Sequence, residues 1–417
     1  MRRALRSLAG VITTLAIALG ACGGPSPSIT GPPQSPVASA TVRPSGTPSP
    51  SASSGPDAEG YRVVWLPPSG VRTVPLEANF RNHRLDSAGP LVVLDELQPG
   101  DTPTNARAII LVDLEAGSWR QLDQAAPGYQ PWDPRISSRT VVWVEWHYEG
   151  PNNTGIADWR IRAQQVHEAH AATVASGVQR RTLQVYGASM PAAAIDGDLV
   201  AYAIEDPIRP PDGWKIVVSS LSRRAVVRTI LSDQSVYDLS IWHGTVAYTV
   251  GRVDPSLGFT YDPRLLVSSP DHPAPRQLAT NAFEVRMRDG RIAWSQDAPT
   301  IVTGAAVGTR IWTAALADLR PLVVSPPVGQ GIEQRQAWPS TGEGLVAWAS
   351  FRLEVGHAEN DGERLCLWSP NSSLPVELRP PLGAVLSGIA DGWVVWTDDR
   401  PDVETISGIP LGSIPLP

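Results

Sequence analysis

"DGRIAW", residues 289–294, is one copy of a short apolar run that recurs through this sequence. The other copies are "GPLVVL" (89–94), "SRTVVW" (138–143), "GDLVAY" (197–202), "HGTVAY" (243–248), "EGLVAW" (343–348) and "DGWVVW" (391–396). The last residues of successive copies are 46 to 59 positions apart. A repeat of this period, built from several short strands, is typical of a β-propeller in which each repeat is one blade.

A second alternating run follows most of the first ones and carries a basic residue in its first two positions. The copies are "RAIILVDL" (107–114), "WRIRAQQV" (159–166), "WKIVVSSL" (214–221), "PRLLVSSP" (263–270), "TRIWTAAL" (309–316) and "ERLCLWSP" (363–370). Short strands separated by turn signals indicate an all-β protein, with an inner pair, a middle strand and an outer strand in each unit. Seven copies of the first run predict seven blades, and six is the alternative because the copy at 89–94 lacks an aromatic residue.

The two ends of the repeat region each contain an incomplete unit. After "WVVWTDDR" (393–400) only "ISGIPL" (406–411) follows, whereas "YRVVWLPPSGVRTVPL" (61–76) has the form of a middle and an outer strand without an inner run. We therefore expect the N-terminal strands to complete the C-terminal blade, because closure of the ring protects both sheet edges. The split of that blade stays open between two plus two strands and three plus one, with "ISGIPL" as the third strand.

An aromatic residue ends six copies of the first run: Trp143, Tyr202, Tyr248, Trp294, Trp348 and Trp396. These residues could form a stacking platform for a sugar or another ligand if several were exposed on one surface. Their strict repetition favours a structural role, in which each one packs between adjacent blades.

The pattern over residues 61–417 resembles the TolB-like and related surface propeller repeats of bacteria, in which "DG-x-x-[IV]-[AV]-[WF]" precedes a short loop, a strand and a hairpin. The "S-P-D-G" turn of TolB is absent, and only "DG" remains, at 196–197, 289–290 and 391–392. A linker also stands where TolB has an N-terminal α/β domain. The resemblance therefore implies the propeller architecture and does not imply a role in the Tol system.

The first residues have the pattern of a secretory signal. Arg2, Arg3 and Arg6 precede the apolar stretch 8–21, which is too short to cross a bilayer. Leu19-Gly20-Ala21-Cys22 resembles the bacterial lipobox, which implies removal of residues 1–21 and lipidation of Cys22. Two or three acyl chains meet the requirement for stable anchoring. We expect a lipoprotein of the bacterial cell membrane whose domain faces the extracytoplasmic side.

The residues after Cys22 separate this anchor from the repeats. Residues 22–58 are rich in Pro, Ser and Gly and contain little that could be buried, which predicts a disordered linker. Residues 59–417 are the predicted propeller domain. Lipidation of Cys22 would exclude a disulfide with the only other cysteine, Cys366, which we expect to be a buried, inert thiol in the apolar run "RLCLW".

Composition and motifs point away from several classes of function. A net charge of −7 and a pI of about 5.6 argue against a nucleic-acid partner. His167-Glu168-Ala169-His170, Asp398-Asp399-Arg400 and "AENDGERL" (358–365, with Glu359, Asp361 and Glu363) are the nearest fragments to a metal, glycosidase or Ca²⁺ motif. Each is interpreted as a loop or turn, so we expect no cofactor, no metal and no recognisable catalytic set.

Three long insertions, 147–158, 205–213 and 251–262, carry Pro, Gly, Tyr and Asp and are expected to line one face of the propeller. The sequence thus favours a binding or scaffold module for a protein or cell-envelope partner. Two alternatives remain open: an enzyme acting on glycans, with acids from several blades meeting at the channel, and a small-ligand sensor domain. Propellers host all three functions, so the fold alone does not choose among them.

Overall fold

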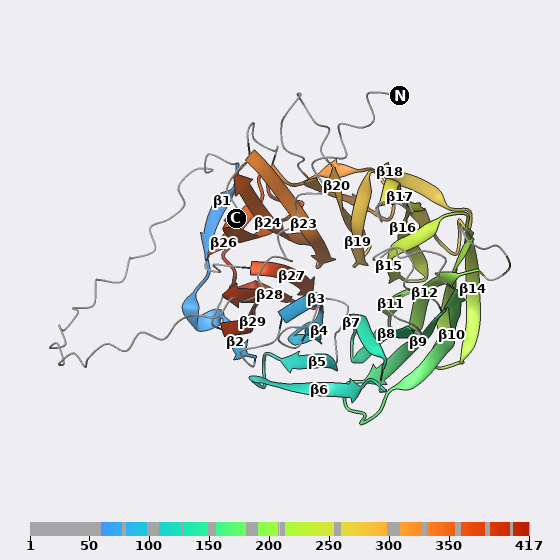
Figure 1. Ribbon diagram of the computed structural model, residues 1–417. Coiled ribbons are helices and arrows are strands. Elements are labelled where there is room, and N and C mark those ends of the chain that lie inside the picture. The colour runs from blue at the N-terminus through green and yellow to red at the C-terminus, as the bar shows by residue number, and fades with distance from the viewer. Residues whose placement is uncertain are drawn as a thin grey trace, which may run out of the picture. The chain divides into compact units, whose positions relative to one another are not determined.

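A computed structural model describes residues 60–76, 81–97, 108–126, 128–148, 156–180, 191–206, 208, 213–253, 260–297, 309–326, 332–354, 360–379, 384–400 and 403–416. All of these residues belong to the compact unit 53–417. The described strands form seven sheets that stand around a central channel (Figure 1). The prediction of an all-β propeller with seven blades is confirmed, and the alternative of six is excluded. No helix in the described part of the chain has the length and hydropathy that a membrane span needs.

The blades are numbered here in chain order, and each sheet runs from the channel to the rim. Blades 1 to 3 contain β3 (Arg81–Ala88), β4 (Leu91–Leu97), β5 (Ala108–Asp113) and β6 (Ser118–Gln124); β7 (Gln130–Ser137), β8 (Thr140–Tyr148), β9 (Ile156–Gln165) and β10 (Ala172–Arg180); and β11 (Ala192–Asp196), β12 (Leu199–Glu205), β13 (Trp214–Ser220) and β14 (Ala225–Ser232). Blades 4 and 5 contain β15 (Ser235–Trp242), β16 (Thr245–Val253), β17 (Thr260–Ser268) and β18 (Arg276–Thr280); and β19 (Ala282–Arg288), β20 (Arg291–Asp297), β21 (Thr309–Ala315) and β22 (Leu322–Val323).

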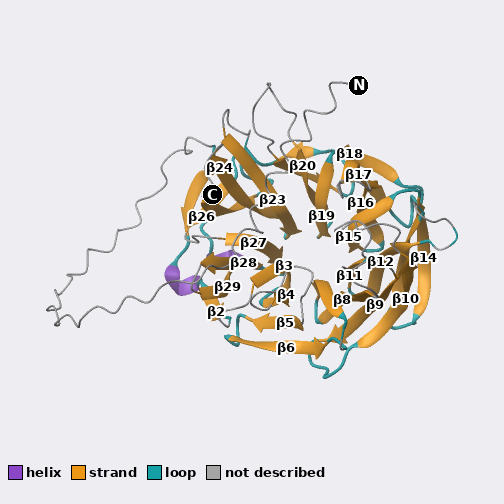
Figure 2. Cartoon of the chain, viewed as in Figure 1, coloured by secondary structure: helices purple, strands orange, loops and turns teal. Residues whose placement is uncertain are grey.

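Blades 6 and 7 contain the closing strands. Blade 6 consists of β23 (Ile332–Gly342), β24 (Leu345–Glu354), β25 (Asn360–Trp368), β26 (Val376–Arg379) and β1 (Arg62–Trp65). Blade 7 consists of β27 (Ala384–Ala390), β28 (Trp393–Arg400), β29 (Val403–Pro410) and β2 (Arg72–Pro75). Two short 3-10 turns, η3 (Pro68–Gly70) and η5 (Leu411–Ser413), are the helical segments among the described residues, and strands dominate the rest (Figure 2).

Two-residue turns join the first and second strands of every blade. In the turns 243–244, 289–290, 343–344 and 391–392 both residues have positive φ, between 45° and 78°, which is the conformation of a type I′ hairpin. Glycine is favoured at the second position because its lack of a Cβ makes positive φ inexpensive. Because neighbouring strands are antiparallel, these turns lie at one end of the ring, the tight-turn end. The connections after each second strand lie at the other end, the loop end.

The ring closes through blade 7 by the three-plus-one split. β27, β28 and β29 come from the C-terminal part of the chain, and β2 adds the outer strand by antiparallel pairing with β29. The side chain of Val74 is buried at the interface between blades 7 and 1, and the Thr73 and Ser407 hydroxyls lie 3.0 Å apart. The prediction that N-terminal strands complete the C-terminal blade is confirmed for β2.

The position expected for "YRVVW" is wrong. β1 does not join blade 7 but pairs in parallel with β26, as a fifth strand at the rim of blade 6 (Figure 1). Tyr61 is buried in the interface between blades 5 and 6, whereas Val64 and Leu66 are buried in the interface between blades 6 and 7. A strand at this place buries apolar residues on both faces, which blade 7 would not have allowed because β29 already provides its third strand.

The core consists of seven apolar clusters, one in each interface between neighbouring blades. The residues that end the repeated runs lie in seven different clusters: Leu94, Trp143, Tyr202, Tyr248, Trp294, Trp348 and Trp396. Each is at most 7% exposed. Leu94 occupies the interface between blades 7 and 1, so the copy without an aromatic residue fills the same structural position.

Candidate functional site in the central channel

The strands that face the channel share a β-bulge. The pairing register shifts between Trp132 and Arg135 in β7, Phe283 and Arg286 in β19, and Ala337 and Ser340 in β23. Inside these bulges Asp133, Glu284 and Trp338 have φ of 51°, 53° and 51°. A bulge bends its strand and re-aims the side chains beside it. Here it directs the polar residues that follow, Arg135, Arg286 and Ser340, to the channel.

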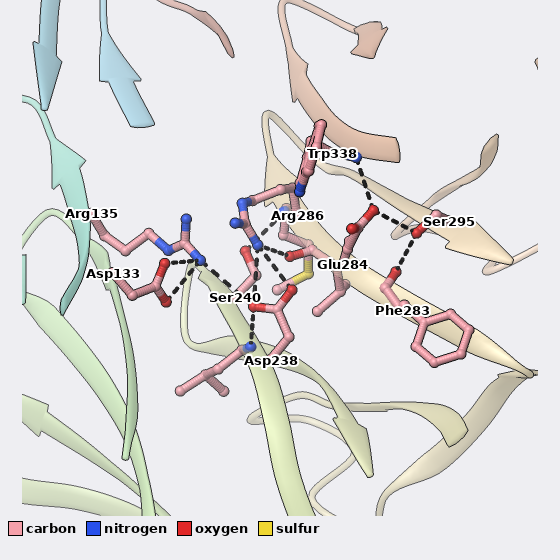
Figure 3. Close-up of polar contacts among 12 residues, drawn as sticks. Asp133, Arg135, Asp238, Ser240, Phe283, Glu284, Arg286, Ser295 and Trp338 are labelled. Carbon is pink, nitrogen blue, oxygen red and sulfur yellow. Dashed lines mark hydrogen bonds and ion pairs between the residues drawn. The ribbon is translucent and has the colours of Figure 1, made fainter. Parts of the chain in front are cut away.

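A chain of ion pairs crosses the channel wall (Figure 3). The Nη2 atom of Arg135 lies 2.9 Å from Oδ1 of Asp133 and 3.6 Å from Oδ1 of Asp238. The other oxygen of Asp238 lies 3.1 Å from Nη1 of Arg286. Asp238 therefore bridges an arginine of blade 2 and an arginine of blade 5. Blade 3 lies between blades 2 and 4, and the inner strand β11 allows the contact because it presents the small residues 192–194, all alanine.

The two bridged arginines have different electrostatic surroundings. Burial and the neighbouring Arg286 cation lower the pKa of Arg135 in spite of nearby carboxylates. For Arg286, burial acts in the same direction but the carboxylates of Asp238, Asp133 and Asp86 outweigh it, so its pKa is raised. The side chain of Arg135 is 4% exposed, and its Nε and Nη1 atoms find no hydrogen-bond partner among the described residues. The positive charge of Arg135 is therefore incompletely balanced.

Arg288 connects blades that are far apart in the sequence. Its guanidinium donates from Nη1 to the carbonyl of Ser87 in blade 1, at 2.7 Å, and from Nη2 to the carbonyl of Ile136 in blade 2, at 3.1 Å. Arg288 itself belongs to β19 of blade 5, so its side chain reaches across the channel. A cross-channel contact of this kind holds the ring together without a disulfide.

A cavity of about 50 Å³ lies in this part of the channel. It is lined by Arg135, Arg286, Arg288, Asp86 and Asp196, together with residues such as Ala194 and Trp242. One water needs roughly 10–15 Å³ of such space, so the cavity holds a few waters or a small ion but no sugar ring. A smaller space of about 20 Å³, lined by Glu284 and Trp338, adjoins it across Asp86, Arg286 and Ser340.

The residues singled out from the sequence lie elsewhere. The repeated aromatic residues are buried between blades, as described above, and do not line the channel cavity. Cys366 is buried between blades 5 and 6, with Sγ 3.9 Å from the carbonyl oxygen of Arg364. Cys22 lies outside the described residues.

The three fragments with chemical motifs are also separate from the channel. His167, Glu168 and His170 are exposed in the turn between β9 and β10. Asp398, Asp399 and Arg400 end β28, and Asp361 and Glu363 belong to β25, whereas Glu359 lies outside the described residues. The described residues contain no group of three or more His, Cys, Asp and Glu side chains that could hold a metal ion.

Sequence reasoning missed the channel residues because no motif marks them. One usable signal exists: Asp133 and Trp338 each precede a proline, Pro134 and Pro339, inside a strand. A proline within a strand is confined to edges and bulges. The sequences "WDPR" and "AWPS" therefore indicate two of the bulges. The inner strand β19 reaches the same geometry without a proline.

A second polar group lies at the loop end of blade 2. The guanidinium carbon of Arg160 lies 3.9 Å from the ring centroid of Tyr129, and the His147 ring centroid lies 5.5 Å from that of Tyr129. His147 Nδ1 is 2.7 Å from the carbonyl oxygen of Gly128. The predicted insertions 147–158, 205–213 and 251–262 join second and third strands of blades 2, 3 and 4, and therefore lie at this same end. Ile208, in the insertion of blade 3, is 86% exposed.

Among solved structures, the chain is similar to the β-propeller domain of the Trilobed protease from Pyrococcus furiosus, reported to reveal an open velcro topology. The TM-score is 0.52 at 9% identity, over 80% of this chain and 95% of that chain. It is also similar to an acylaminoacyl peptidase in complex with Z-Gly-Gly-Phe-chloromethyl ketone (TM-score 0.49, 13% identity, 78% of this chain and 51% of that chain). Uncomplexed Pyrococcus horikoshii acylaminoacyl peptidase gives a TM-score of 0.49 at 12% identity, over 80% of this chain and 52% of that chain.

The chain thus spans about half the length of these two peptidases. No protein-family model matches the sequence, and no curated protein sequence matches it. At such low identity the likeness to the protease domain shows the fold alone, which agrees with the propeller implied by the TolB-like repeats.

Proposed function

We propose that this protein is a lipoprotein, anchored to a bacterial membrane through Cys22, whose propeller binds a protein or cell-envelope partner on the extracytoplasmic side. The support for the anchor is the sequence Leu19-Gly20-Ala21-Cys22 at the end of a short apolar stretch. The linker that follows would hold the propeller away from the membrane, because a chain rich in Pro, Ser and Gly stays extended and flexible.

The loop end of blades 2 to 4 carries the binding proposal. Three consecutive blades place their longest second-to-third-strand connections there, beside the stacked Tyr129 and Arg160. Tyrosine and arginine are enriched in the energetically important parts of protein interfaces. The exposed Ile208 adds apolar surface at the same end. The channel cavity, in contrast, is too small for a macromolecular or sugar ligand.

Membrane fractionation tests the anchor. We expect Cys22→Ala to release the protein into the soluble fraction, whereas Cys366→Ala, which removes the other thiol of the chain, should remain with membranes. Persistence of Cys22→Ala in the membrane fraction would refute the lipoprotein proposal and leave the binding proposal to its own test.

Affinity capture from envelope extract tests the binding face. The wild-type protein, Tyr129→Ala and Arg160→Ala are compared with Arg320→Ala, which changes an arginine that is 87% exposed at the tight-turn end. We expect the first two substitutions to reduce capture of the same partner at least tenfold, and the third to leave it unchanged. A glycan array with the same variants separates the alternatives, since binding to defined sugars only would contradict a protein partner and favour action on glycans.

A further inference from the structure

The channel cavity has an unusual balance of charge in its lining. Its ionisable lining residues are Arg135, Arg286, Arg288, Asp86 and Asp196, which give three cations and two anions. Both carboxylates already accept hydrogen bonds from the backbone: Asp86 from the Ile136 N–H, at 2.9 Å, and Asp196 from the His243 N–H, at 2.5 Å. The cations therefore exceed the acids on the cavity surface.

Two of these arginines retain capacity for an acceptor. Arg288 donates to two backbone carbonyls, which satisfy its N–H groups without neutralising its charge. Arg135 contacts Asp133 and Asp238 through Nη2, whereas Nε and Nη1 are buried without a partner among the described residues (Figure 3). Leaving a buried donor without a partner is unfavourable, most of all for a charged group.

The electrostatics of Arg135 indicate what kind of acceptor is missing. Burial and the Arg286 cation together outweigh the carboxylates around it, so its pKa is lowered. An added negative charge would stabilise the guanidinium, whereas a neutral acceptor would satisfy the donors only. The cavity volume of about 50 Å³ restricts the ligand to a few heavy atoms.

We propose that the cavity binds one small monovalent anion, of the size of chloride or formate, on Arg135 Nε and Nη1 with Arg288 beside it. This site is independent of the partner-binding role proposed above, because it lies between the inner strands and not at the loop end. Its consequence is structural: the anion would join blades 2 and 5 across the channel and make the stability of the ring depend on the anion present.

Calorimetric titration of the full-length protein in detergent tests the site, with sodium formate and sodium chloride as probes. Sodium gluconate keeps the ionic strength constant and is too large to enter. We expect one binding event per chain for each small anion. Arg135→Lys retains the charge but lacks the guanidinium nitrogens, and should weaken binding at least tenfold. Ala194→Val fills the cavity without removing a charge and should have the same effect, whereas Ala225→Val at an exposed position on β14 should not.

A measurement on the wild-type protein keeps the proposal falsifiable if the variants fail to fold. Crystals soaked in sodium bromide should show an anomalous peak within hydrogen-bond distance of Arg135 Nε or Nη1. Heat of binding that survives in both folded cavity variants would place the anion elsewhere and overturn the proposal. A cavity that holds water only, with no anomalous peak and no binding heat, would overturn it as well.

Discussion

The carboxylate of Asp289 accepts a hydrogen bond from the backbone N–H of Glu343, at 2.7 Å, and so connects the tight turn of blade 5 to the tight turn of blade 6. The same kind of contact joins Asp196 to His243, and the Ser137 hydroxyl to the Gly197 N–H. The aspartate of the repeat therefore ties neighbouring blades together, in addition to favouring the turn that contains it.

We expect Asp289→Ala to lower the free energy of unfolding by about 0.5–1 kcal/mol through loss of this exposed hydrogen bond. Asp391→Ala is the matched control, because Asp391 has the same place and positive φ in blade 7 and accepts no hydrogen bond from a described residue. Urea denaturation monitored by circular dichroism measures both. Equal losses in the two variants would show that turn conformation, and not the contact between blades, accounts for the effect.

The repeated aromatic residues make a stronger prediction. Trp294 is 0% exposed between blades 4 and 5, and Trp294→Ala should cost about 3–5 kcal/mol because it leaves a cavity in the interface. Trp65→Ala removes an indole that is 59% exposed, and should change stability by less than about 1 kcal/mol. Differential scanning calorimetry compares them. A small effect of Trp294→Ala would argue against a structural role for the repeated position.

Ring closure is tested by three chains that begin at residues 59, 70 and 77. The first retains β1 and β2, the second loses β1, and the third loses both strands. We expect the first to unfold cooperatively at the temperature of the full-length protein, and the second at a lower temperature because it uncovers the edge of β26. The third should lose cooperative unfolding. A cooperative transition in the third chain would contradict closure through β2.

Alkaline pH should destabilise the protein through Tyr248. Burial raises the pKa of its phenol above the ordinary value, and the Asp233 carboxylate raises it further. The folded protein thus holds the phenolic proton more tightly than the unfolded chain, whose tyrosines titrate near pH 10. Stability should be complete below that pH and fall by about 1.4 kcal/mol per pH unit above it.

Denaturation of Tyr248→Phe between pH 8 and 11 measures this contribution, because phenylalanine has no proton to lose. The variant should show a shallower alkaline loss than the wild-type protein. Tyr129→Phe, at the loop end, is the matched control and should retain the wild-type slope. Identical pH profiles for all three proteins would assign the alkaline loss to other groups.

The bridge in the channel should contribute more than a surface ion pair. Asp238→Asn removes the carboxylate between Arg135 and Arg286 and should cost about 3 kcal/mol, because it leaves buried cations facing each other. Asp318→Asn breaks the exposed pair with Arg320, at 3.9 Å, and should cost less than about 1 kcal/mol. Thermal denaturation at two salt concentrations compares them, and similar losses would show that the channel is well solvated.

Much of the fold was predictable from local patterns, and the channel site was not. The apolar run ending at Trp294 recurs because every blade must bury its second strand against two neighbours, which writes the same signal into the sequence repeatedly. Arg135, Asp238 and Arg286 come from three blades and have no common spacing. Only the bulges and the small inner strand β11 bring their side chains together, and neither feature has a strong signal in the residues themselves.

The sequence by itself determined that this is a β-propeller, that it has seven repeats, and that its N-terminal strands close the ring, because burial in every blade and protection of the sheet edges are requirements that act on local patterns. The tertiary structure decided which strand goes where. "YRVVW" and "VRTVPL" are alike as strands, but β1 is buried at the rim of blade 6 and β2 completes blade 7. The tertiary structure also decided that Asp238 bridges two arginines across blade 3, since such a contact depends on the curvature of the ring and the bulges of its inner strands.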